Sequence, residues 1–172
     1  MPTPSSFSPA LTARQQDILK RYNSSAKMRY FFIKDLPTLW WWGVRVEQAT
    51  PASVGVSVPY GWRTQNPFQS TYFAAQSGAA ELSTGLLVLL AAQGESRRIS
   101  TLVVNFEAQF TKKATERVTY TCQMGEEIFA AVHRCVELNA PQAIVAESIG
   151  KTLAGVEVGR VKVTWSLKAK EG

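Results

Sequence analysis

Apolar and polar positions alternate with two different periods along this chain, and the period changes divide it into helical and extended segments. Residues 11–23 carry apolar side chains at helical spacing, and Ser8 followed by Pro9 suits an N-cap and first turn. A second helical stretch over residues 26–36 is predicted to stop at Pro37. The chain therefore opens with two helices, and the tryptophans that follow lead into sheet.

A period of two then replaces the helical period. Residues 44–48 and 53–60 alternate in this way on either side of a turn, which predicts a β-hairpin. Val54, Val56 and Val58 share one face of its second strand. This face is expected to point toward the core.

The segment over residues 70–93 is apolar or small on every side, with Glu81 as its one ionisable residue, and Gly94 follows as a stop signal. A helix of this composition has to be wrapped by other structure. A carboxylate inside such a helix is costly unless it is paired, hydrogen-bonded or protonated. Glu81 is thus either a carboxylate at a polar rim or subunit contact, or a functional group.

The second half of the chain repeats the same two patterns. Strands are predicted at residues 101–111, 117–124, 142–152 and 156–168, with a helix at residues 126–138. Neighbouring strands look like hairpin partners, so the sheet should be antiparallel. The order of elements predicts an α+β fold in which an antiparallel sheet wraps around one long central helix, with extra N-terminal helices and a further helix between later strands.

Length and composition fit one domain. The chain has 172 residues with 45% hydrophobic and 19% charged positions, as in a soluble globular protein. We expect a single domain over residues 1–172, with a helical extension over 1–42 and a core over 43–170. The longest uninterrupted apolar run, residues 85–92, is too short to cross a bilayer, and no targeting signal is visible. A cytoplasmic protein without a membrane span is expected.

Residues that could ligate a metal are few. The two cysteines, Cys122 and Cys135, do not make a disulfide framework, and neither has a histidine partner at metal-binding spacing. The single histidine, His133, falls on a predicted helix, where a surface role is favoured. We therefore expect neither a metal nor another cofactor.

The net charge of +6 admits nucleic acid, an anionic membrane surface or a phosphorylated ligand as a partner. The basic residues are scattered, and they do not interleave with aromatic residues on one strand or helix. Nucleic acid is therefore not expected. The tight pairs Arg97–Arg98 and Lys112–Lys113, together with Arg63, could instead hold phosphates as exposed charges.

Three separated segments resemble one known superfamily. Residues 63–85 (RTQNPFQSTYFAAQSGAAELSTG), 102–114 (LVVNFEAQFTKKA) and 163–168 (VTWSLK) are similar to hotdog-fold acyl-thioester hydrolases. The resemblance spans residues 44–168 and points to an uncharacterised bacterial branch, similar to the thioesterases of phenylacetic acid degradation. It implies a hotdog fold, an acyl-CoA substrate and a homodimer, with a dimer of dimers as a larger assembly.

The resemblance also implies site residues. Asn66 matches an asparagine before the helix, Phe73 stands where relatives have a glycine whose N–H binds the thioester carbonyl, and Glu81 replaces the commoner aspartate. Glu81 would activate water or attack directly to give an anhydride, the Phe73 N–H would stabilise the oxyanion, and Asn66 would position water or substrate. In relatives, the acid and the asparagine of one site come from different subunits. Expected substrate-binding residues are Trp41, Arg63, Phe68, Tyr72 and Ser77.

Two other readings use the same residues. A non-catalytic hotdog dimer would bind an acyl chain or another apolar ligand in the same pocket, and a structural or interaction protein would need no pocket. The tryptophans at positions 40–42 either pack against the core or line an apolar ligand.

Overall fold

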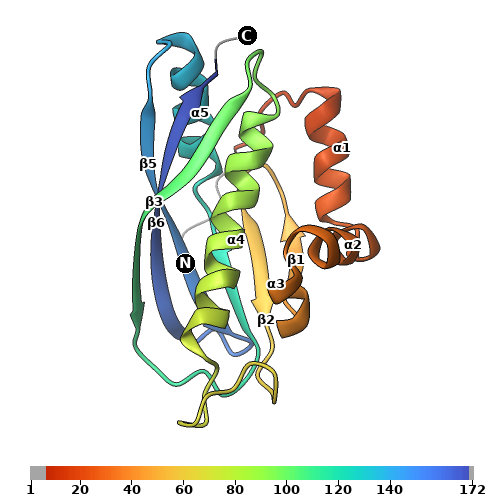
Figure 1. Ribbon diagram of the computed structural model, residues 1–172, viewed down its shortest axis with the longest axis vertical. Coiled ribbons are helices and arrows are strands. Elements are labelled where there is room, and N and C mark those ends of the chain that lie inside the picture. Colours follow the sequence, from red (N-terminus) through yellow and green to blue (C-terminus); the bar gives the residue numbers. More distant parts are fainter. Residues whose placement is uncertain (1–6, 171–172) are drawn as a thin grey trace.

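A long central helix lies against a strongly curved antiparallel sheet in the computed structural model, which describes residues 7–170 (Figure 1). Residues 1–6 and 171–172 of the expected domain lie outside the described residues. The sheet has the order β1-β2-β4-β5-β6-β3, with antiparallel neighbours throughout. Its strands are β1 (Arg45–Ala49), β2 (Val54–Val58), β3 (Ile99–Phe110), β4 (Val118–Cys122), β5 (Gln142–Thr152) and β6 (Glu157–Ala169).

The helices are α1 (Ala13–Tyr22), α2 (Ser25–Asp35), α3 (Pro37–Trp42), α4 (Phe73–Ala92) and α5 (Gly125–Glu137). The expected N-cap at Ser8 is wrong, because Thr12 caps α1. The Thr12 hydroxyl accepts from the Gln15 N–H at 3.2 Å, and the Gln15 side-chain oxygen accepts from the Thr12 N–H at 3.0 Å. This reciprocal pair is a capping box, which satisfies two N–H groups at the start of the helix.

Pro37 does not simply stop a helix. It occupies the first turn of α3, where its missing N–H costs nothing. The three tryptophans therefore lie on a short helix that the sequence pattern did not predict. Trp40 and Trp41 are 38% and 49% exposed, whereas Trp42 packs against the core.

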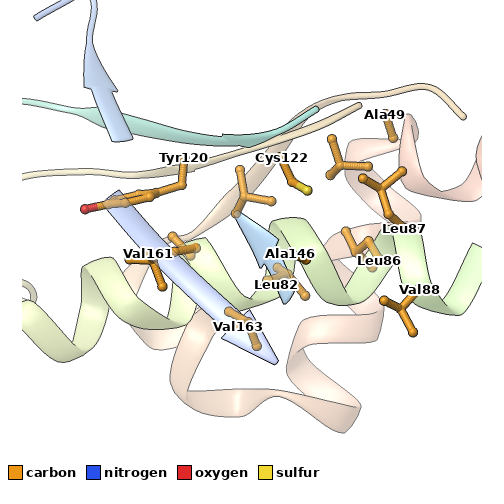
Figure 2. Packing of buried hydrophobic residues seen from close by; sticks show 14 of the residues in the cluster. Ala49, Leu82, Leu86, Leu87, Val88, Tyr120, Cys122, Ala146, Val161 and Val163 are labelled. Carbon is orange, nitrogen blue, oxygen red and sulfur yellow. The ribbon is translucent and has the colours of Figure 1, made fainter. Parts of the chain in front are cut away.

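The core forms between α4 and the concave face of the sheet (Figure 2). Leu82, Leu86 and Leu87 of α4 meet Tyr120 and Cys122 of β4 there, together with Ala146, Val161 and Val163 from β5 and β6. By length and composition α4 could cross a membrane, but 67% of its 18-residue apolar stretch is buried inside the molecule. The apolar composition of α4 is explained by its burial against the sheet.

Strand β3 forms one edge of the sheet, and its outer side has no partner strand among residues 7–170. It pairs with β6 along its length, with an irregularity between Val103 and Asn105. Several of its apolar side chains are exposed, including Leu102 at 64%, Val104 at 55% and Phe106 at 38%. A long edge strand with exposed apolar residues is a natural site for pairing with another chain.

Candidate active site

The loop that enters α4 is tied to the body of the protein by backbone groups. The Thr71 N–H donates to the Ala114 carbonyl at 2.7 Å, and the Thr71 hydroxyl donates to the same carbonyl at 3.0 Å. One residue later, the Tyr72 N–H donates to the Thr64 carbonyl at 2.6 Å. These bonds fix where α4 begins.

A chain of buried hydrogen bonds also holds the start of α4 in place. The Tyr120 hydroxyl donates to Gln76 Oε1 at 3.0 Å, and Gln76 Nε2 donates to the Thr71 carbonyl at 3.0 Å. Burial raises the pKa of Tyr120, so its hydroxyl keeps its proton and remains a donor. The first turn of α4 is thereby linked to β4.

A cavity of about 360 Å³ opens at this point, between the start of α4 and the end of β3. It is lined by Asn66, Ser70, Thr71, Phe73, Gln76, Phe110, Thr111, Lys112, Lys113 and Ala114. The lining joins a helix N-terminus, apolar rings and two lysines. It can accept a polarised carbonyl beside an apolar group and an anion.

Asn66 is one of the residues in this cavity. Its Oδ1 accepts hydrogen bonds from the Phe68 N–H at 3.0 Å and from both the N–H and the hydroxyl of Ser70 at 3.2 Å. The side chain is therefore fixed by its own loop as an Asx turn. Its amide nitrogen has no acceptor among residues 7–170 and remains able to donate to a ligand.

The N-terminus of α4 supplies free donors. Tyr72 is the N-cap residue and makes no side-chain cap bond, and the Ser70 hydroxyl is engaged by Asn66. The N–H groups of Phe73 and Ala74 have no acceptor among residues 7–170. Unpaired N–H groups of this kind stabilise a negative oxygen. The Phe73 ring, 56% exposed, packs edge-on against Tyr72 at 4.9 Å between centroids.

Glu81 lies farther along α4, beside the Trp165 ring of β6. A Cβ added at Gly85 would lie 3.3 Å from Glu81 Oε1 and 3.2 Å from Trp165 Cζ2, so the glycine leaves room for both groups. The ring is held by a bond from Trp165 Nε1 to the Thr84 hydroxyl at 3.0 Å. Desolvation raises the pKa of Glu81.

The Ser77 hydroxyl, one turn before Glu81 on α4, is buried without any partner among residues 7–170. The Glu81 carboxylate has no donor within the described residues either. Ser77 and Glu81 lie one turn apart on the same side of α4, so two polar groups there lack partners.

The structure divides the expected site residues into separate groups. Asn66 and Phe73 line the cavity, whereas Glu81 does not and follows Phe73 by about 12 Å of helix rise. Phe68 and Tyr72 lie near it with 73% and 43% of their surfaces exposed.

Trp41 and Arg63 lie at another place. Arg63 borders a second cavity between α2, α3 and β1, and its guanidinium lies 5.6 Å from the centre of the Trp41 ring. His133 is exposed and lies 3.4 Å from Glu95. Residues 7–170 contain no group of three or more His, Cys, Asp and Glu side chains placed to hold a metal.

Several cavity residues are not among those that the sequence predicts for the site. Gln76 is the one large polar residue in the first turn of α4, and this isolation is the feature of the sequence that could have marked it as a site residue. Phe110 comes from the end of β3, which the sheet topology brings beside α4. Lys112 and Lys113 were noted as a basic pair, and the fold places both at the cavity.

The fold is similar to that of solved proteins described as thioesterases. A protein of unknown function from Pseudomonas aeruginosa, described as a probable thioesterase, is similar with a TM-score of 0.73 and 17% identity, over 94% of this chain and 100% of that one. A Haemophilus influenzae thioesterase matches with a TM-score of 0.61 and 10% identity, over 85% and 91%. A thioesterase enzyme from Staphylococcus aureus matches with a TM-score of 0.53 and 15% identity, over 74% and 94%.

The sequence itself assigns the family. Residues 25–167 match the model described as "Domain of unknown function (DUF4442)", and the chain belongs to this family. Comparison with curated proteins gave no match. The hotdog fold and the resemblance to its thioesterases, both expected from the sequence, are confirmed.

Proposed function

We propose that this protein hydrolyses acyl-CoA or related acyl thioesters at a site shared by the two subunits of a cytoplasmic homodimer. The observation that carries the proposal is Glu81, a carboxyl with a raised pKa on the central helix of a thioesterase fold. A general base is most effective when its pKa approaches the working pH, and desolvation moves Glu81 in that direction. Titratable groups perturbed in this way are concentrated at functional sites.

The hydrolysis follows from these groups. Glu81 takes a proton from water as the water oxygen attacks the thioester carbonyl carbon, and the carbonyl oxygen becomes an oxyanion that the Phe73 N–H stabilises. The carbon–sulfur bond then breaks. The CoA sulfur leaves with the proton held by Glu81, giving the free acid and the CoA thiol. The Asn66 amide orients the water or the substrate.

The separation of Glu81 from Asn66 and Phe73 within one chain supports a site shared by two subunits. Within one chain, Glu81 stands away from the cavity that holds Asn66 and Phe73. The edge of strand β3 that faces away from β6 has no partner strand among residues 7–170, and pairing two such edges around a two-fold axis would bring Glu81 of one protomer together with Asn66 and Phe73 of the other. A continuous sheet across the interface follows from the proposal.

Two further features support it. Variants of the Staphylococcus aureus protein have been solved in which a glutamine or a glutamate is replaced by alanine, 15 positions apart, the same separation as Asn66 and Glu81. Lys112 and Lys113 at the cavity also suit the phosphates of CoA. Affinity for acyl-CoA should then fall as salt is raised, because exposed charges are screened.

One experiment tests the activity. The purified protein is offered short, long and aromatic acyl-CoA thioesters, and thiol release is followed for the parent, Glu81→Gln and the control Glu137→Gln. Glu137 is exposed at the end of α5 and lacks an ion pair among residues 7–170. We expect Glu81→Gln to lose about 10²-fold or more, the scale of general base catalysis, while the control retains activity.

A parent that hydrolyses none of these thioesters, or a Glu81→Gln variant as fast as the parent, would refute the thioesterase proposal. The second candidate is then a dimeric binder of acyl chains. Phe73 favours it, because an aromatic ring lines the cavity where related enzymes have a glycine. Binding of acyl-CoA without turnover, measured by calorimetry, would identify this function. A monomeric mass by light scattering would remove the shared site in either case.

A further inference from the structure

The cavity that Arg63 borders lies outside the candidate active site and is larger than the cavity at the start of α4. It has a volume of about 540 Å³ and is enclosed by α2, α3 and β1, with Arg63 from the loop before α4. It has no lining residue in common with the cavity at the start of α4. Ligand pockets have volumes of about 300–1,000 Å³, so a small organic molecule fits.

Three arginines from different elements line this cavity: Arg29 of α2, Arg45 of β1, and Arg63 of the loop before α4. None of them lies within 4.0 Å of a carboxylate among residues 7–170. The one acidic residue in the lining, Glu47, is 3.3 Å from Arg117 and also accepts from the Ser57 hydroxyl. The cavity is therefore lined by unpaired positive charge, which attracts an anion.

One of these groups is held in place before any ligand binds. The Arg63 guanidinium lies over the Trp41 ring, 5.6 Å from its centre, in a cation–π arrangement. A Cβ at Gly43 would lie 3.5 Å from Arg63 Nη2, and Gly43 has a φ of +73°, a conformation that favours glycine. An arginine fixed in this way loses less conformational entropy on binding.

One part of the cavity wall is apolar. Met28, Phe32 and Val44 are each 3% exposed and contribute to the lining, and Trp40 adds a half-exposed aromatic wall. A bare inorganic anion would leave the exposed surface of Trp40 facing water. An anion with an apolar body would cover that surface and meet the arginines with its charged end.

We propose that this cavity binds an amphipathic organic anion, with a carboxylate or phosphate group on Arg29, Arg45 and Arg63 and an apolar body on Met28, Phe32 and Trp40. Guanidinium forks bind both kinds of oxyanion in a bidentate manner. The site is distinct from the thioester site. It does not require Glu81 or a second subunit.

The test uses the full-length protein and four probes: octanoate, 1-naphthyl phosphate, 1-octanol as an uncharged match, and inorganic phosphate as a head group alone. Affinity is measured by calorimetry for the parent, for Arg29→Gln and Arg45→Gln, and for the control Arg134→Gln. All three arginines have exposed side chains, so the variants should fold, which thermal unfolding checks. Amide chemical shifts report where the probe binds.

We expect saturable binding of octanoate or 1-naphthyl phosphate, with the stronger of the two identifying the head group. The uncharged and head-only probes should bind at least tenfold more weakly. Arg29→Gln and Arg45→Gln should each weaken the best probe about tenfold or more, the scale of a charge-assisted hydrogen bond, and Arg134→Gln should not. Shifts should centre on the amides of residues 43–47.

The proposal is overturned if neither anion binds, if the Arg29→Gln and Arg45→Gln variants bind as tightly as the parent, or if the shifts are confined to residues 66–73. The last result would place the probe in the thioester cavity instead. A failure of thioester hydrolysis leaves this test unaffected, because the probes and variants address a different cavity.

Discussion

Removal of one buried hydroxyl should weaken the support beneath the candidate active site. Tyr120 is 0% exposed and Gln76 is 4% exposed, and their 3.0 Å hydrogen bond continues to the Thr71 carbonyl. Tyr120→Phe keeps the ring in the core but leaves Gln76 Oε1 without its donor. The variant therefore tests the hydrogen bond with little change in packing.

The expected cost follows from the burial of both partners. An unsatisfied buried acceptor costs about 1–3 kcal/mol, which corresponds to a fall in Tm of roughly 2–12 °C for a chain of this length. Tyr30→Phe is the matched control, because Tyr30 is 68% exposed and its hydroxyl has no partner among residues 7–170. It should change stability by less than about 0.5 kcal/mol.

Thermal and urea unfolding followed by circular dichroism measures both variants, at one protein concentration because subunit association adds to stability. The same change in a Gln76→Met background should cost about 1 kcal/mol less, since the partner is already gone. Equal Tm values for Tyr120→Phe and Tyr30→Phe, or an equal cost in both backgrounds, would refute the role given to this bond.

Two other variants probe the groups at the site. Burial raises the pKa of Glu81 in the folded protein. The contribution of this shift to folding stability is therefore complete below the pKa that Glu81 has in the unfolded chain, and it is lost as the pH rises through the pKa of the folded protein. Glu81→Gln should therefore unfold at a higher temperature than the parent at neutral pH, with the difference vanishing in acid; a less stable variant at neutral pH would contradict the desolvation. Asn66→Ala removes the acceptor of three hydrogen bonds and should cost about 1–2 kcal/mol in thermal unfolding, whereas Asn66→Asp should cost less than about 0.5 kcal/mol; the opposite order would contradict the Asx turn.

The pattern of apolar and polar residues predicts most of the helices and strands, because helical spacing and alternation are each set by residues close together in the sequence. The β-hairpin, α4, α5 and the later strands all lie where alternation or helical spacing placed them. The N-cap of α1 was readable but missed: Thr12 followed by Gln15 is a capping-box pattern. Pro37 was ambiguous, since a proline suits both the end of one helix and the first turn of the next.

The site was less predictable for a topological reason. Asn66 and Phe73 are close in sequence, so their proximity follows from the chain itself. Phe110 and Lys113 join them only because β3 and the segment after it return beside the start of α4. The cationic cavity likewise combines Arg29, Arg45 and Arg63, which no local pattern brings together.

The shared site is tested most directly by a hybrid dimer of two defective subunits. One subunit carries Glu81→Gln and the other Asn66→Ala, and two different tags allow the hybrid to be purified. Each homodimer should be inactive toward the best acyl-CoA substrate. In the hybrid, the intact Glu81 of one subunit meets the intact Asn66 of the other at one of the two sites, so we predict about half of the parent activity. A hybrid as inactive as both homodimers would contradict a site built from two subunits.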